Sequence, residues 1–288
     1  MGLDAMLREI VRALPPGMEN RLRLLARKVG PVRRAYRRSI AMRYYSDHLR
    51  QIREWAAADG ETSNFYYDIT DINRDQLAHL VSNVTGRSYV EVVGFFEELE
   101  TDVELRMHLQ SSLLNTNYGR DIKVKYGRRL GWYAFVRASR PRIVIETGVD
   151  HGVGSCVLSS ALLRNGAEGF PGRYYGTDFR REAGQFYAGV YATVGQILYG
   201  DSIQSLKAFD QPIDLFVNDS DHSAKYEYDE YQTIKAKLSP NALILGDNSH
   251  ATDSLSRFSR ETGRCFLFFS EKPKDHWYPG AGIGISYQ

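Results

Sequence analysis

The stretch Arg142-Ile143-Val144-Ile145-Glu146-Thr147-Gly148-Val149-Asp150-His151-Gly152 decides the fold. It begins as a short apolar β-rich run, which is typical of a strand that is buried on both faces. A glycine-containing turn follows, and residues 155–165 then have the pattern of a helix. A strand, a glycine turn and a helix in this order form the first unit of a sheet that binds a ligand at its carboxyl edge.

Six further β-rich runs follow along the chain: 173–178, 196–200, 213–218, 242–246, 265–270 and 281–287. Helical stretches separate several of them, notably 223–238, which predicts parallel strands joined by helical crossovers. The first five runs, counted from 142–147, show little alternation, so we expect each to be buried on both faces. The last two lie close together and are expected to pair antiparallel. The predicted fold class is therefore α/β, a doubly wound, mostly parallel seven-strand sheet with an N-terminal helical extension.

The predicted domains are a helical N-terminal region, 1–124, and a sheet domain, 125–288. Apolar residues recur at helical spacing in the first part, with proline and glycine breaks, and a third helix is expected over roughly 32–57. Two more helices are expected to begin at capping boxes, Ser88 with Glu91 and Thr101 with Glu104. We expect this region to cover the acceptor site and to contribute to a homo-oligomer, most simply a dimer.

Composition excludes several classes of protein. The chain has 288 residues, of which 43% are hydrophobic and 25% are charged, as in a soluble globular protein. Its two cysteines, Cys156 and Cys265, are too few for a disulfide scaffold. The start lacks the pattern of a secretory signal, and Met6 departs from the Ser or Thr of a myristoylation signal. No apolar run approaches the roughly 18 residues of a membrane span. These features predict a cytoplasmic protein.

The net charge of +2 hides a difference between the two ends of the chain. Residues 1–55 hold 13 Lys and Arg against 5 Asp and Glu, a net charge of +8, and the remainder has a net charge of −6. Four arginines are expected on one helical face: Arg33, Arg34, Arg37 and Arg38. This face predicts peripheral contact with an anionic membrane or with an anionic carrier on the acceptor; the alternative is a solvated face or a contact with a partner subunit. No nucleic-acid recognition motif accompanies the charge, so nucleic acid is not an expected partner.

Carboxylates stand where three successive strands end. Glu146 directly precedes the glycine turn, Asp178 ends the second run, and Asp201 follows the third. The turn has the pattern G-x-x-x-G-x-G instead of the dinucleotide pattern G-x-G-x-x-G, and a carboxylate beside it suits a cationic or hydroxylated ligand better than a pyrophosphate. Asp178 is placed to hold a ribose diol, and Asp201 a purine edge. The alternative is that all three are ordinary strand-end turns.

This layout resembles the class I S-adenosylmethionine-dependent methyltransferases over roughly residues 125–288. The resemblance implies that Glu146 and Gly148 border the methionine and sulfonium end of the cofactor, that Asp178 binds its ribose, and that Asp201 lies near its adenine. The cofactor-binding set that we predict is Glu146, Thr147, Gly148, Gly152, Ser155, Asp178, Asp201 and Ser202.

Two more strand ends bring oxygen ligands to the same edge. Asp219 follows the fourth run, and Asp247 with Asn248 follows the fifth. Because the carboxyl ends of parallel strands meet at one edge, these side chains can converge and bind a hard cation such as Mg²⁺. His222 can take a proton from a substrate hydroxyl. The alternative is turn chemistry at Asp247 and Asn248 and a surface histidine, which is also how we interpret His151 and His250.

These two motifs resemble those of the metal-dependent O-methyltransferases. Catechol-type and caffeoyl-CoA-type members carry Asp-x-x-Lys followed by Asp-Asn, and macrolide-sugar types carry Asp-x-x-His at the first position. This chain combines Asp219-x-x-His222 with Asp247-Asn248. The resemblance implies an Mg²⁺-dependent O-methyltransferase with Asp219 and His222 as catalytic residues and a sugar or glycosylated metabolite as the favoured acceptor. Three residues form either an acceptor lid or a packed loop: Tyr66, Tyr67 and Asp68.

Two other functions stay open. A Rossmann-type nicotinamide-dependent oxidoreductase would carry G-x-G-x-x-G after the first strand, and that pattern is absent here. A non-catalytic protein that binds S-adenosylmethionine and docks on membranes would have lost part of the carboxylate cluster, whose residues are all present. The acceptor and the position of methylation are not encoded in any motif that we recognise.

Overall fold

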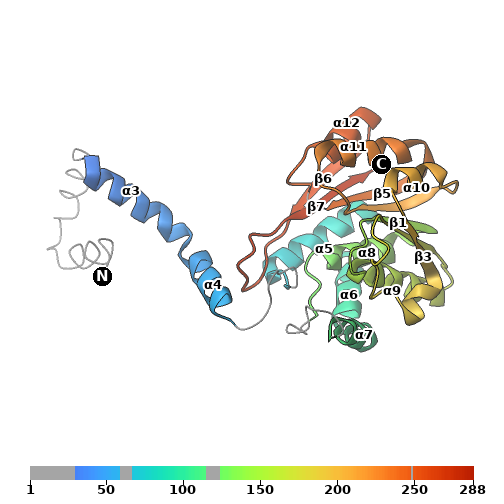
Figure 1. The fold of residues 1–288 in the computed structure, drawn as a ribbon, viewed down its shortest axis with the longest axis horizontal. Coiled ribbons are helices and arrows are strands. Elements are labelled where there is room, and N and C mark those ends of the chain that lie inside the picture. Colours follow the sequence, from blue (N-terminus) through green and yellow to red (C-terminus); the bar gives the residue numbers. More distant parts are fainter. Residues whose placement is uncertain (1–29, 59–66, 115–123, 248) are drawn as a thin grey trace. The chain divides into compact units, whose positions relative to one another are not determined.

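The computed structural model describes residues 30–58, 67–114, 124–247 and 249–288 (Figure 1). The chain separates into two compact units, Met1–Ala58 with Asp275–Trp277, and Asp59–Lys274 with Tyr278–Gln288. Helices α5 to α7 belong to the second unit, together with the sheet. The division into 1–124 and 125–288 stays a prediction.

The described part of the first unit contains two helices, α3 (Gly30–Tyr44) and α4 (Ser46–Ala57). They replace the single helix expected over 32–57, because Tyr45 between them has a non-helical backbone with φ −107° and ψ 4°. The four arginines of the predicted face, Arg33, Arg34, Arg37 and Arg38, lie on α3 and are exposed. None of the described helices is long and apolar enough to span a bilayer. The helices predicted before residue 30, and Tyr66, lie outside the described residues.

The second unit is built on a seven-stranded sheet with the order β3-β2-β1-β4-β5-β7-β6. β7 runs antiparallel to both of its neighbours, and all the other pairs are parallel. The predicted α/β class, with seven strands and an antiparallel last pair, is confirmed. The strands are β1 (Ile143–Thr147), β2 (Arg173–Asp178), β3 (Gly195–Tyr199), β4 (Ile213–Asn218), β5 (Leu238–Asp247), β6 (Cys265–Ser270) and β7 (Gly282–Tyr287).

One burial prediction is wrong, because β3 is not buried on both faces. Its residues are half-buried or exposed. The reason is its position at one edge of the sheet, where only β2 pairs with it. An apolar run therefore indicated a strand correctly but did not indicate its place in the sheet.

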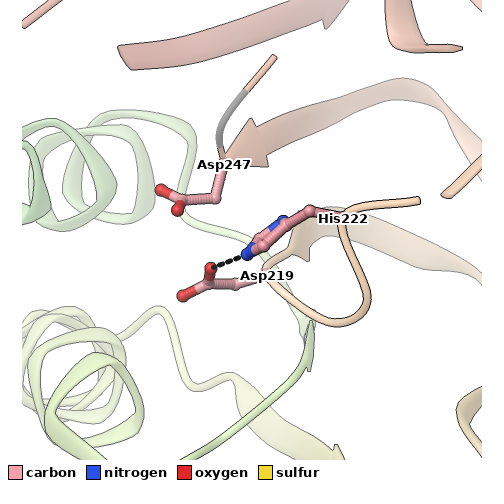
Figure 2. A group of neighbouring side chains, drawn as sticks. All are labelled: Asp219, His222 and Asp247. Carbon is pink, nitrogen blue, oxygen red and sulfur yellow. Dashed lines mark ion pairs between the residues drawn. The ribbon is translucent and has the colours of Figure 1, made fainter. Parts of the chain in front are cut away.

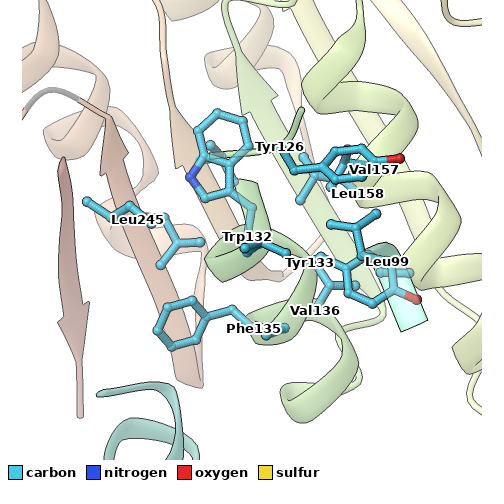
Figure 3. Close-up of a cluster of buried hydrophobic side chains, with 14 of the residues drawn as sticks. Leu99, Tyr126, Trp132, Tyr133, Phe135, Val136, Val157, Leu158 and Leu245 are labelled. Carbon is cyan, nitrogen blue, oxygen red and sulfur yellow. The ribbon is translucent and has the colours of Figure 1, made fainter. Parts of the chain in front are cut away.

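Each face of the sheet has its own hydrophobic core, because successive residues of a strand point to opposite faces. On one face, Val144 and Leu245 belong to a core with the helices α5 to α9. Figure 3 shows Trp132 and Phe135 of α8 in this core, beside Leu245 of β5. On the other face, Ile145 belongs to a core with residues of α10, α11 and α12. The helices are α5 (Asp71–Thr85), α6 (Tyr89–Glu100), α7 (Val103–Leu114), α8 (Arg129–Ser139), α9 (Val153–Ala167), α10 (Ser202–Ala208), α11 (Ala224–Ile234) and α12 (Ser254–Thr262).

The two predicted capping boxes have different outcomes. Ser88 and Glu91 form the expected reciprocal pair at the start of α6. The pair of Thr101 and Glu104 is wrong, because Asp102 caps α7 by accepting a hydrogen bond of 2.9 Å from the amide of Leu105. Thr101 is instead the C-cap residue of α6. The aspartate next to it competes as N-cap, and its carboxylate is the stronger acceptor.

Candidate functional site

The turn between β1 and α9 has an unusual backbone. Gly148, Asp150 and Gly152 all have positive φ, at 83°, 48° and 96°. Asp150 is a non-glycine residue in this region, and such conformations collect at functional sites. Its carboxylate pairs with the guanidinium of Arg180 at 2.7 Å, which helps to hold the turn.

Gly148 is the point where the ends of β1 and β4 meet. A Cβ on Gly148 would overlap the carbonyl oxygen of Asp219 and lie 2.5 Å from its carbonyl carbon. The amide of Asp219 donates to the carbonyl of Thr147 at 2.9 Å, and the amide of Gly148 donates to Thr177 at 2.9 Å. The predicted cofactor turn and the loop that carries Asp219 are therefore in direct contact.

Glu146 lies beneath this turn and is 1% exposed. Its carboxylate accepts hydrogen bonds from Ser155 at 2.8 Å and from the hydroxyl of Tyr174. Burial raises the pKa of Glu146 to about 7, although both hydrogen bonds oppose the rise. Of the predicted cofactor residues, Glu146 and Ser155 are thus brought together, in a buried network.

Asp178 and Asp201 stand at the next two strand ends. Asp178 Oδ2 accepts the amide of Asp150 at 3.0 Å, and its Oδ1 accepts the amide of Arg180 at 2.9 Å. Oδ2 keeps the capacity to accept from a further donor. Asp201 caps α10 through Gln204 at 2.8 Å and also accepts from the hydroxyl of Tyr226. Both carboxylates therefore have structural partners in addition to any role at a ligand.

The candidate metal cluster is formed by Asp219, His222 and Asp247 (Figure 2). One ligand atom from each residue lies within 4.8 Å of the others. His222 Nε2 is 3.9 Å from Asp219 Oδ1, and the His222 side chain is 42% exposed, whereas that of Asp247 is fully buried. Asn248, the third predicted oxygen ligand, lies outside the described residues.

A buried arginine, Arg128, adjoins this cluster. Its guanidinium donates to both carboxylate oxygens of Asp247, with 2.6 Å from Nη2 to Oδ2. Nη1 lies 3.4 Å from Glu271 and 3.1 Å from the hydroxyl of Tyr67. Burial alone would raise the pKa of Asp247, but the charge and hydrogen bonds of Arg128 lower it overall. Burial and the neighbouring Asp247 raise the pKa of Asp219 well above its ordinary value.

Residues 145–249 match a family model described as a methyltransferase domain. Residues 145–249 are therefore similar to methyltransferase domains. This match bears out the predicted resemblance to the methyltransferases over this segment. The matched segment begins within β1, continues past the end of β5 and holds all of the candidate cofactor and metal residues.

Three of the solved structures that are similar to this chain are methyltransferases by name. An O-methyltransferase from Bacillus cereus in complex with SAH is 14% identical over 68% of this chain and 97% of its own, with a TM-score of 0.47. A methyltransferase from Geobacter sulfurreducens is 15% identical over 69% and 97%, with a TM-score of 0.48. The O-methyltransferase TomG from Streptomyces achromogenes, in complex with SAM, is 15% identical over 65% and 89%, with a TM-score of 0.47. No curated protein matches the sequence.

The structure also bears on residues for which the sequence left a structural role open. Tyr67 is buried and its ring packs 5.6 Å from that of Tyr278, which favours the packed loop over the lid for this residue. His151 lies 5.5 Å from the ring of Phe186, outside the metal cluster. Asp221 accepts the amide of Ser223 at 2.9 Å, in a turn just before α11.

Sequence reasoning missed two buried charged residues of the second unit, Arg128 and Glu230. Arg128 precedes β1 and is outside any strand-end motif, so only its position directly before the apolar helix α8 could have drawn attention to it. Glu230 is one of two glutamates on the buried stripe of α11, with Glu227, Tyr231 and Ile234. Carboxylates at helical spacing among core positions were the available signal.

Proposed function

We propose that this chain is an Mg²⁺-dependent O-methyltransferase that transfers a methyl group from S-adenosylmethionine to a hydroxyl of a small molecule. The observation that carries the proposal is the approach of Asp219, His222 and Asp247 to one another, in contact with the glycine turn of a methyltransferase domain.

The residues of the cluster suit proton removal from an acceptor hydroxyl. His222 is accessible and takes the hydroxyl proton as the acceptor oxygen forms its bond to the methyl carbon. Asp219, 3.9 Å from Nε2, stabilises the imidazolium that results. S-adenosylmethionine supplies the methyl group, and its carbon–sulfur bond breaks to leave a neutral thioether. Positioning of the two reactants supplies much of the rate in such a displacement.

The donor set of the cluster fits a hard divalent cation. Asp219, Asp247 and Glu271 are buried or half-buried carboxylates near the guanidinium of Arg128, and the charge of Arg129 also acts on the two aspartates. Burial and the neighbouring Asp247 raise the pKa of Asp219, and a cation bound between the two carboxylates would oppose this rise. Carboxylate ligands suit Mg²⁺ or Mn²⁺, and a cation held by Asp219 and Asp247 would lower the pKa of the acceptor hydroxyl.

Removal of divalent cations is expected to abolish methyl transfer, and added Mg²⁺ should restore it. The measurement is formation of S-adenosylhomocysteine in the presence of EDTA, with a panel of sugars and glycosides as acceptors. Calorimetry should also show one Mn²⁺ bound to the wild-type protein and none to Asp219→Asn. Undiminished transfer in EDTA would contradict the role of the cation, and binding of NADH in place of S-adenosylhomocysteine would contradict the methyltransferase proposal as a whole.

His222→Ala is expected to lower kcat by about 10²- to 10⁴-fold, the usual contribution of a general base. The affinity for S-adenosylhomocysteine should stay unchanged, because the residue faces the acceptor side of the cluster. His250→Ala is the matched control, since His250 lies in a turn outside the cluster. Equal rates for the two variants would exclude His222 as the base.

The spacing of Asp219 and His222 supports a sugar or glycosylated metabolite as acceptor, as part of the same proposal. The exposed arginine face of α3 supports peripheral contact with an anionic membrane. The predicted homo-oligomer also stays a proposal. The family match favours the methyltransferase over the oxidoreductase, and the intact cluster favours an enzyme over a non-catalytic binding protein.

A further inference from the structure

The structure contains a second buried carboxylate network, centred on Glu230 of α11. This side chain has no exposed surface, and its carboxylate accepts hydrogen bonds from four neutral side chains. The donors are Ser202 Oγ, Asn218 Nδ2, Ser220 Oγ at 2.8 Å and Thr147 Oγ1 at 3.3 Å. No ion pair of Glu230 is found among the residues that the structure describes, so hydrogen bonds alone hold this carboxylate.

Each donor belongs to a strand end that the proposed function uses. Thr147 is the last residue of β1 and is paired in register with Asn218, the last residue of β4. Ser220 follows Asp219 in the loop that leads to His222, and Ser202 begins α10 after β3. One carboxylate thus connects the methionine end of the predicted cofactor site, its adenine end and the catalytic loop.

A tyrosine extends the network to the predicted adenine end. The hydroxyl of Tyr226 lies 2.9 Å from Ser202 Oγ and donates to Asp201 Oδ2 at 3.1 Å. Tyr226 and Glu230 are one turn apart on α11, so their side chains reach the same strand ends. The geometry of Asp201 is therefore coupled to that of Glu230 through two hydroxyls.

We propose that Glu230 is a positioning residue for S-adenosylmethionine, whose ionised carboxylate holds the ends of β1 and β4 and the start of α10 in the arrangement that binds the cofactor. This inference rests on the proposed function. An ionised carboxylate has two oxygens with about four acceptor positions and can satisfy all four donors. Protonation or amidation removes part of this capacity, and the strand ends then lose their common partner.

Glu230→Gln is expected to weaken the binding of S-adenosylhomocysteine about 10-fold or more, equivalent to the loss of one to two hydrogen bonds at this site. The substitution preserves size, but one of the two carboxylate oxygens becomes an amide nitrogen that cannot accept, so the donors on that side, Ser202 Oγ or Asn218 Nδ2, lose their acceptor. Glu227→Gln is the matched control. Glu227 lies on the same helix and is also buried, but it accepts from Thr252 and not from the strand ends.

The pH dependence of binding separates positioning by the charge from simple packing. Burial raises the pKa of Glu230 to about 7. Affinity of the wild type should therefore fall as the pH drops from 8 to 6, whereas that of Glu230→Gln should change less. Glu146, with its pKa raised to about 7, is present in all three proteins, as are the neighbours Tyr226, Tyr231 and Asp201. The difference between the profiles thus reports on Glu230.

The test is calorimetry with S-adenosylhomocysteine on the full chain and both variants, together with hydrogen exchange of the protein without ligand. Thermal unfolding shows that the variants are folded. We expect faster exchange at residues 146–149, 200–203 and 218–221 in Glu230→Gln only. Equal affinity and exchange in Glu230→Gln and Glu227→Gln would overturn the positioning role. If the wild type binds no S-adenosylhomocysteine, the proposed function fails, and the exchange data still decide whether Glu230 holds these segments.

Discussion

Gly148→Ala is expected to lower the free energy of unfolding by about 3 kcal/mol and to abolish binding of S-adenosylhomocysteine. Two physical effects add at this position. Its φ of 83° is unfavourable for any residue with a Cβ. The added methyl group would also overlap the backbone of Asp219 and lie 2.8 Å from Ser220 Cα. Backbone atoms cannot move aside as the end of a side chain can, so the ends of β1 and β4 must separate.

The control for this variant isolates the steric part of the effect. Gly86 also has a positive φ, 70°, and caps α5, but a Cβ there would meet nothing within 4 Å. Gly86→Ala should therefore cost only about 1 kcal/mol, the conformational part. Urea unfolding gives both values and calorimetry gives the affinities. Similar losses for the two variants would show that the contact between Gly148 and Asp219 is not tight.

Much of this fold could be predicted because its strands are marked locally. The runs at 173–178, 213–218 and 265–270 have the bounds of β2, β4 and β6, since apolar β-rich runs flanked by turn residues leave few other choices. The common carboxyl edge then follows from parallel topology, and it brought Asp219, His222 and Asp247 together as expected. Their roles in metal binding and catalysis stay predictions.

The features that could not be predicted depend on contacts between distant segments. Arg128 meets Asp247 across 119 positions of sequence, and Asn73 of α5 bonds to Ser270 across 197. No local pattern encodes such pairs, because they arise only when α8 and the sheet pack together. The burial of Glu230 was not predicted for a related reason, because a charged residue on a helix is normally assigned to the solvent-exposed face.

Arg128→Met is expected to destabilise the protein more than Gly148→Ala does. Its free energy of unfolding should fall by about 3–5 kcal/mol at pH 8, as when one partner of a buried ion pair is removed. Methionine fills much of the volume of the arginine but leaves Asp247 and Glu271, both fully buried, without a cation. Unfolding is measured in EDTA, because a divalent cation at Asp247 would replace part of the lost charge.

The matched control is Arg74→Met. Arg74 also forms a two-point pair, with Glu100 at 3.0 and 2.8 Å, but its side chain is 26% exposed and that of Glu100 is 38% exposed. Solvent screens this pair, so its loss should cost about 1 kcal/mol or less. Equal losses for the two arginine variants would indicate that Asp247 is not buried as described.

The stability of Arg128→Met is expected to depend on pH through the protonation of Asp247. In the wild type, Arg128 holds the pKa of Asp247 below its ordinary value despite burial, so the pair contributes stability above that value and loses it as the pH falls. In the variant, burial, which is the largest effect on this pKa, is opposed only by the hydrogen bond with Asp219 and by the charge of Arg129, and it raises the folded pKa above the unfolded value of about 3.9. Stability of the variant should then decrease as the pH rises through this interval, so its deficit is larger at pH 8 than at pH 5.

Adding Asp247→Asn to Arg128→Met removes the unpaired charge. The double variant should recover part of the lost stability and have a flatter pH profile, because the two positions are in direct contact. A deficit that is independent of pH in Arg128→Met would show that packing, and not the charge of Arg128, stabilises this part of the site.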